Sequence, residues 1–270
     1  MSNVTSNKDI DNLFNGAKNE GQITPESMKL LMNLGMGARF KEAMGVPAID
    51  AQTSEVIMLT ILVDDSGSIA MARNEQLVRD GCNQTLDAMM ATKQKETVQV
   101  SIRYINGTIL TPYVPLEQAP RLDGQNYIAS GQTPLYDESA ATYATVLAKT
   151  LEFSNVGIPV RAITITITDG ADMGSVKYKA RDIKPLVTDM LKAENQMILA
   201  MGISDGSTDF RQVFTEMGLT PESILTPGNS AHEIRQAFKT ASQSAVRASQ
   251  TANFHSAVMG GFGATPTTTP

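Results

Sequence analysis

The 270-residue sequence is short of several residue types, and each shortage excludes a class of protein. Its single cysteine, Cys82, excludes an intrachain disulfide, and its place in a helical pattern predicts a small buried apolar residue. Lys and Arg form no block with interleaved aromatic residues, and the formal net charge is −6, so we expect no nucleic-acid partner. No apolar run approaches transmembrane length, and the first residues lack the apolar core of a signal peptide. We therefore expect a cytoplasmic protein with no membrane association.

Two further shortages argue against an enzyme. The two histidines, His232 and His255, lie in or beyond the last predicted helix, where a role at the surface or at the edge of the core is expected. The phosphate-binding pattern Gly-x-x-x-x-Gly-Lys-Ser/Thr does not occur, which excludes that kind of nucleotide hydrolase. We predict a protein without catalytic activity.

The most informative stretch begins with the almost unbroken apolar run 55–63. A run of this length, rich in β-branched residues, is typical of a central strand in a parallel sheet. Asp64-Asp65-Ser66-Gly67-Ser68 follows it directly. The side chains of Asp64, Ser66 and Ser68 are oxygen donors at alternate positions, which suits a hard divalent cation such as Mg²⁺. The same residue types also suit a helix N-cap, so the pentapeptide alone leaves both interpretations open.

The order of the remaining elements predicts the fold. Strands and helices alternate, and Asn106-Gly107 predicts a tight hairpin that adds one antiparallel edge strand. We expect strands over 55–63, 98–104, 108–114, 159–168, 197–203 and 223–225, and helices over 70–92, 134–153, 182–194, 209–217 and 230–248. This order is typical of a doubly wound α/β fold with a mostly parallel central sheet and helices on both faces.

The ends of the chain differ from this pattern. We expect residues 1–53 to form an N-terminal arm, loose over 1–22 and then with a short amphipathic helix that Thr24 caps and Pro25 begins. The Met content of the arm suits either core filling or an adaptable binding face. The α/β domain is expected over 54–250, and 251–270 is expected to be a flexible tail.

Ligands of doubly wound folds bind beyond the carboxyl ends of the strands. Besides the pentapeptide, that edge receives Thr133, which follows a long loop, and Asp169, which ends the strand 159–168. Thr133 also precedes Pro134 as a helix N-cap would. The convergence of these oxygen donors at one edge favours the metal site over the cap.

Three motifs together resemble a known family. Asp64-x-Ser66-x-Ser68, Thr133 within Gly-x-Thr-Pro-Leu, and Asp169 within Thr-Asp-Gly resemble the von Willebrand factor A (VWA) domain and its metal-ion-dependent adhesion site (MIDAS). The resemblance covers about residues 54–250. Each motif is weak by itself, but their order and their positions at the ends of successive predicted elements make the set specific.

The resemblance implies a role for each residue. Ser66 and Ser68 would bind Mg²⁺ directly, with Mn²⁺ and Ca²⁺ as alternatives, and Thr133 would bind directly or through water. Asp64 and Asp169 would hold ordered waters, or one of them would bind directly. Because few direct ligands carry charge, the ion stays electrophilic and can take a carboxylate from a partner protein. Three nearby acids are expected either to support the ligands without touching the ion or to be solvated at the surface: Asp65, Asp137 and Asp172.

The sequence looks most like intracellular bacterial or phage members of the family, including those linked to tellurium resistance and to MoxR-type AAA+ ATPases. This predicts a metal-dependent adaptor in a stress-response or ATPase-linked assembly. One alternative is a structural subunit of a phage or other large particle. Another is a Mg²⁺-dependent phosphoryl-transfer enzyme with Asp64 as nucleophile, although the motif loops contain no lysine.

Overall fold

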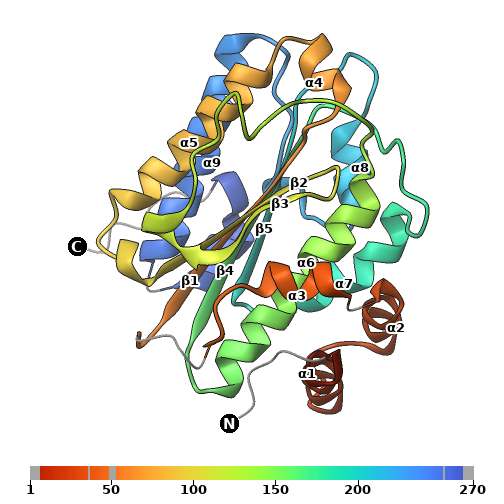
Figure 1. Cartoon of the computed structure of the whole chain (residues 1–270), viewed down its shortest axis with the longest axis vertical. Helices are drawn as coiled ribbons and strands as arrows, with labels where there is room; N and C mark the ends of the chain where they lie inside the picture. The colour runs from red at the N-terminus through yellow and green to blue at the C-terminus, as the bar shows by residue number, and fades with distance from the viewer. Residues whose placement is uncertain (1–6, 36, 49–52, 252, 264–270) are drawn as a thin grey trace.

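A six-stranded sheet forms the centre of the computed structural model, which describes residues 7–35, 37–48, 53–251 and 253–263 (Figure 1). The strand order is β3-β2-β1-β4-β5-β6. The strands are β1 (Val56–Val63), β2 (Val98–Tyr104), β3 (Ile109–Pro115), β4 (Val160–Thr168), β5 (Gln196–Gly202) and β6 (Ile224–Leu225). All neighbouring pairs are parallel except β2 and β3. The predicted fold class is therefore confirmed.

β1 is the central strand, as its apolar sequence predicts. All eight of its residues are buried, and it pairs with β2 on one side and β4 on the other. The sheet order reverses between β1 and β4, so the carboxyl end of β1 lies at the topological switch point, where doubly wound folds place their ligands.

Helices cover both faces of the sheet (Figure 1). The helices are α1 (Asn7–Asn19), α2 (Pro25–Leu34), α3 (Ala38–Met44), α4 (Gly67–Met71), α5 (Glu75–Met90), α6 (Leu135–Asn155), α7 (Ala180–Lys192), α8 (Phe210–Glu216), α9 (Ala231–Gln250) and α10 (Phe254–Gly260), with short 3₁₀ helices η2 (Lys95–Thr97), η3 (Leu116–Gln118), η4 (Pro221–Ser223) and η5 (Gly261–Gly263). One core contains side chains of α5, α9 and α10, and the other contains side chains of α1–α3 and α6–α8. None of the helices in the described parts combines the length and apolarity needed to cross a bilayer.

The hairpin at Asn106-Gly107 forms as predicted. The amide of Tyr104 donates to the carbonyl of Thr108 at 2.8 Å, and Gly107 has a φ of 97°, which favours glycine. β3 is the edge strand and contains Pro112, which an edge tolerates.

The single helix predicted over 70–92 is wrong, because the chain breaks it into α4 and α5. Arg73 adopts a left-handed φ of 59°, and the amide of Asn74 donates to the carbonyl of Ile69 at 2.9 Å. The break gives the Asp64–Ser68 turn a short helix of its own before the long helix α5 begins.

Two other helix starts differ from expectation. α6 starts at Leu135 with Pro134 at its N-cap position, so Thr133 is not the cap. α7 starts at Ala180, where the amide of Lys179 donates to the carboxylate of Asp182 at 2.8 Å. Pro185 therefore lies in the second turn of α7 rather than in its first.

The arm is more ordered than the sequence suggested. Residues 7–19 form α1, whose buried Ile10, Phe14 and Ala17 follow the spacing of an amphipathic helix. The expectation of a loose segment over 1–22 is thus wrong from residue 7 onward, and residues 1–6 lie outside the described part. Thr24 caps α2 as predicted, and its hydroxyl accepts a hydrogen bond from the amide of Ser27.

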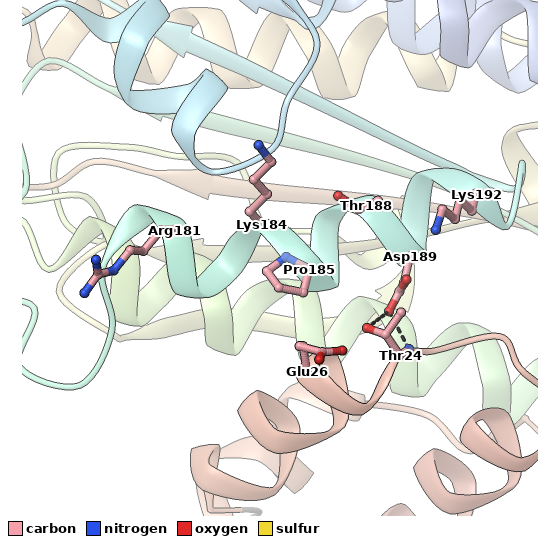
Figure 2. Close-up of a pocket in the computed structure, with 8 residues that line it drawn as sticks. All are labelled: Thr24, Glu26, Arg181, Lys184, Pro185, Thr188, Asp189 and Lys192. Carbon is pink, nitrogen blue, oxygen red and sulfur yellow. Dashed lines mark hydrogen bonds between the residues drawn. The ribbon is translucent and has the colours of Figure 1, made fainter.

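Polar contacts fasten the arm to the helices beneath it. Asp189 of α7 accepts hydrogen bonds from the amide and hydroxyl of Thr24, each at 2.7 Å (Figure 2). It also accepts one from the hydroxyl of Ser27 at 2.5 Å. On α6, Glu152 accepts from the amide of Ala48 at 3.0 Å, and Lys149 donates to the carbonyl of Val46. The arm is therefore packed on α6 and α7 rather than separate from them.

The expected flexible tail over 251–270 is wrong for its described part. α10 and η5 pack onto the sheet, with Phe254, Val258 and Phe262 buried in the core. Gly261 has a φ of 50°, and a Cβ there would lie 2.2 Å from the carbonyl oxygen of Glu222. Apolar side chains on a short helix, closed by a glycine that permits close approach, explain this docking. Residues 264–270 lie outside the described part.

Candidate metal centre

The structure brings the serine hydroxyls and Asp169 together at the carboxyl end of β1 and β4. The hydroxyl oxygens of Ser66 and Ser68 are 2.8 Å apart, and Ser68 donates to Asp169 Oδ1 at 2.5 Å. The amide of Gly67 donates to the carbonyl of Gly131 at 3.2 Å, which holds the β1–α4 turn against the loop that leads to Thr133. Residues separated by about 100 positions thus share one small site.

Thr133 joins the same site through Gly170. A Cβ at Gly170 would lie 3.3 Å from the Thr133 hydroxyl and 3.4 Å from the Ser68 hydroxyl, so both hydroxyls border the space beside this glycine. The backbones of Thr133 and Met173 bond to each other in both directions, at 2.9 and 2.8 Å. These bonds fix Thr133 relative to the loop that follows Asp169.

Asp64 lies deeper than the hydroxyls and organises them. It is fully buried, its Oδ1 accepts from the amide of Ser66 at 2.8 Å, and its Oδ2 accepts from the hydroxyl of Thr168 at 2.5 Å. Tyr127 donates to the Asp64 carbonyl. Both carboxylate oxygens therefore have donors, which suits a residue that shapes the site and holds water rather than a free nucleophile.

Burial sets the electrostatics of the two acids. Desolvation raises the pKa of Asp64, and hydrogen bonds from Ser66 and Thr168 partly offset it. Desolvation also raises the pKa of Asp169 to about 6, against the lowering effect of the Ser68 hydroxyl. Buried carboxyls of this kind favour a nearby cation, because a cation compensates the cost of their negative charge.

The three other acids have positions of their own. Asp65 accepts from the amide of Asn106 at 3.0 Å, which ties the turn to the β2–β3 hairpin, and burial raises its pKa to about 6. Asp137 accepts from the amides of Val176 and Tyr178, and Asp172 accepts from the hydroxyl of Ser175. Asp137 thus fastens the loop after β4 onto the start of α6, and Asp172 does so too by accepting from the amide of Tyr136 at 3.2 Å.

The donor set fits a hard divalent cation. Ligands about 2.1 Å from an octahedral ion lie about 3 Å from one another, close to the observed spacing of the serine hydroxyls. Hydroxyl and carboxylate oxygens suit Mg²⁺, Mn²⁺ or Ca²⁺ better than softer metals. Within residues 7–35, 37–48, 53–251 and 253–263, no cluster of three or more His, Cys, Asp or Glu side chains is arranged to hold a metal. Any metal at this edge therefore depends on Ser and Thr hydroxyls.

Some residues of the site had no clear sequence signal. Thr168 is the last threonine of the strand in which Thr and Ile alternate, and its place before Asp169 in the Thr-Asp-Gly motif does not show that its hydroxyl donates to Asp64. Tyr127 reaches the site from a loop 63 positions away, and only the folded chain reveals that contact.

No protein-family model matches the sequence, and no curated protein matches it. Solved structures do match its fold. The pilus adhesin SpaC from Lactobacillus rhamnosus GG, in its open conformation, is 16% identical with a TM-score of 0.52, over 73% of this chain and 30% of SpaC. Proximal thread matrix protein 1 from the mussel byssus, with a zinc-occupied MIDAS motif, is 15% identical with a TM-score of 0.46, over 72% of this chain and 46% of that protein. The SpRpn10 VWA domain is 12% identical with a TM-score of 0.45, over 68% of this chain and 94% of the domain.

These likenesses concern the fold. The match spans less than half of the adhesin and of the byssus protein. The chain thus shares a doubly wound α/β fold with SpaC, which it resembles little in sequence.

Proposed function

We propose that this chain is a metal-dependent protein-binding module of the VWA type. Residues 54–250 would form the binding domain, with Mg²⁺ held by Asp64, Ser66, Ser68, Thr133 and Asp169. When bound, the ion would supply an electrophilic position for a carboxylate of a partner protein. Ser66 and Ser68 would hold it without adding charge, and Asp64 would keep the turn in place.

One observation supports this proposal above all others. The hydroxyls of Ser66 and Ser68, the carboxylate of Asp169 and the hydroxyl of Thr133 border one space, although they come from three separate loops. The MIDAS of the byssus protein, which holds zinc, agrees with a divalent cation at such a site. Mg²⁺ is our choice because hydroxyl-rich sites suit a small hard ion.

The cellular context that we propose comes from the family resemblance. The module would act in the bacterial cytoplasm as an adaptor, with a MoxR-type AAA+ ATPase as one candidate partner and stress response, such as tellurium resistance, as one candidate process.

The two alternatives lose some of their motivation. The structural-subunit hypothesis relied on a loose arm and a glycine-rich segment that neighbours would order, but residues 7–35, 37–48 and 253–263 fold against the same chain. Size measurement of the purified protein tests it, since a stable monomer contradicts it.

The enzyme hypothesis requires Asp64 as a nucleophile, and its carboxylate is buried with both oxygens hydrogen-bonded.

Calorimetric titration with Mg²⁺ tests the site directly. We expect one ion per chain, with affinity at least tenfold weaker in Asp169→Asn and in Ser68→Ala. Asp80→Asn, an exposed acid on α5, is the matched control and should bind like the unmodified protein. Equal binding by all four proteins would reject the site.

Partner capture with and without chelator tests the function. A metal-dependent partner should be lost in chelator and also in Asp64→Ala and Thr133→Ala. Retention of every partner by these two variants would reject metal-dependent recognition.

A further inference from the structure

Exposed apolar side chains gather on the loops of the metal centre. Among the described residues, the large hydrophobic side chains that are exposed are Met32, Val46, Met71, Ile128, Val156, Met173, Val176 and Met259. Four of these eight belong to the loops that supply the proposed ligands or to the short helix α4 that continues one of them. We call Met71, Ile128, Met173 and Val176 the apolar rim.

A backbone pairing places Met173 beside a hydroxyl ligand, and the short helix α4 places Met71 a few residues after Ser68. Met173 is 67% exposed, and its backbone pairs with that of Thr133. Met71 is 82% exposed and ends α4, the short helix that begins at Gly67 inside the metal turn.

The other two members lie on the loops next to these. Ile128 is 63% exposed and lies three residues before Gly131. The carbonyl of Gly131 accepts a hydrogen bond from the amide of Gly67. Val176 is 88% exposed, and its amide donates to Asp137 at 2.9 Å. Hydrogen bonds order all three loops, so the rim is a fixed feature of this edge.

The rim requires an explanation because folded proteins seldom gather apolar side chains in water without a partner. Of the remaining exposed hydrophobic residues, Met32 and Val46 belong to the arm, Val156 follows α6, and Met259 is on α10. Single exposed residues of this kind are ordinary. Four on the loops of one site indicate a contact surface.

We propose that the partner presents an Asp or Glu side chain within an apolar segment, so that the acid meets the metal centre while its neighbours pack on the apolar rim. This inference rests on the proposed function and names the chemistry of the partner. Charge complementarity selects the acid, since the cation needs an anion at its open position. Apolar burial on the rim then selects the flanking residues.

Two peptides with one central Asp test the proposal. One has Leu on both sides of the Asp and the other has Ser, and fluorescence anisotropy measures binding of each at saturating Mg²⁺. We expect the Leu-flanked peptide to bind at least tenfold more tightly, as burial of one or two large apolar side chains predicts. Chelator should abolish its binding. Met173→Ser should reduce its affinity about tenfold, while Met259→Ser, of similar exposure at 61%, should leave it unchanged.

The outcomes separate this inference from the proposed function. Equal binding of both peptides, or binding unaffected by Met173→Ser, overturns the inference and leaves metal-dependent capture intact. Absence of peptide binding while calorimetry still shows Mg²⁺ bound also overturns it. Equal binding of a Leu-flanked Asn peptide would show that the acid is not needed, which overturns the inference. Binding of phosphatidylserine vesicles without binding of either peptide would show that the apolar rim contacts lipid instead, which also overturns it. Absence of Mg²⁺ binding rejects the proposed function as well.

Discussion

At the scale of single residues, the candidate metal site depends on the open space beside Gly170 rather than on a dense cluster of charged side chains. Gly170 keeps that space open between the hydroxyls of Thr133 and Ser68. A side chain there would fill it without the backbone strain that accompanies a positive φ, because Gly170 is not in the left-handed region. Function and stability can therefore be separated at this position.

Gly170→Ala should weaken Mg²⁺ binding severalfold while changing the midpoint of thermal unfolding little. The added methyl group would lie 3.3 Å from the Thr133 hydroxyl, which must move by a few tenths of an ångström, and 3.4 Å from the Ser68 hydroxyl, so it would occupy the space between them. Calorimetry and a thermal melt measure the two effects. Gly124→Ala is the control, since a Cβ there meets nothing within 4 Å. Unchanged affinity in Gly170→Ala would show that the ion does not use this space.

The residue scale also shows what the sequence could predict of the site. Asp64, Ser66 and Ser68 could be placed at the sheet edge because they follow an apolar strand, and carboxyl ends of parallel strands share one edge. Asp169 followed from the same rule, whereas Thr133 follows a long loop and was assigned through its Gly-x-Thr-Pro-Leu motif. The roles of Thr168 and Tyr127 could not be predicted, because side-chain hydrogen bonds across many positions leave no local pattern.

At the scale of elements, regular patterns were predictable and irregular backbone was not. The alternating or apolar strands and the Asn106-Gly107 hairpin have strong local signals. The break before α5 depends on the left-handed backbone conformation of Arg73, and arginine is not a residue type that predicts this conformation. α1 was missed because Asn and Gly dilute the apolar spacing of Ile10 and Phe14, and contacts with α2 and α6 stabilise it.

The packing of α5 against α9 predicts a contrast between two helical glycines. A Cβ at Gly81 of α5 would lie 2.2 Å from the ring of Phe238, so Gly81→Ala should lower the free energy of unfolding by about 1–3 kcal/mol. Gly16→Ala in α1 meets nothing within 4 Å and should raise it by about 0.5–1 kcal/mol, because alanine favours a helix. Urea unfolding measures both. A Gly81→Ala variant more stable than the unmodified protein would contradict the close approach of α5 and α9 at Gly81 and Phe238.

Asp189 of α7 supplies one of the polar attachments of the arm, beside those of Lys149 and Glu152 on α6. Asp189→Ala would leave the buried hydroxyl of Ser27 and the amide of Thr24 without their acceptor, which should cost about 2 kcal/mol or more. Limited proteolysis should then cut the arm first. Asp182→Ala, an exposed cap on the same helix, is the comparison and should leave the arm protected. Equal protection in both variants would show that apolar contacts suffice.

At the scale of the whole molecule, metal binding should stabilise the fold, because the ligands come from three loops that meet only when the sheet is complete. A ligand that binds only the folded state stabilises it by about 2.7 kcal/mol at one hundred times its dissociation constant. We expect Mg²⁺ to raise the midpoint of thermal unfolding, chelator to reverse the rise, and Asp169→Asn to show none. An equal rise in that variant would indicate a general salt effect.

The layout in Figure 1 has a practical consequence for measuring these interactions. α1 lies at the bottom of the view and α4, next to the metal turn, lies at the top. A fluorophore or surface tether on an exposed side chain of α1, such as Lys18, would therefore lie at the opposite end of the molecule from the metal turn. Immobilisation through that end should leave incoming ligands unobstructed.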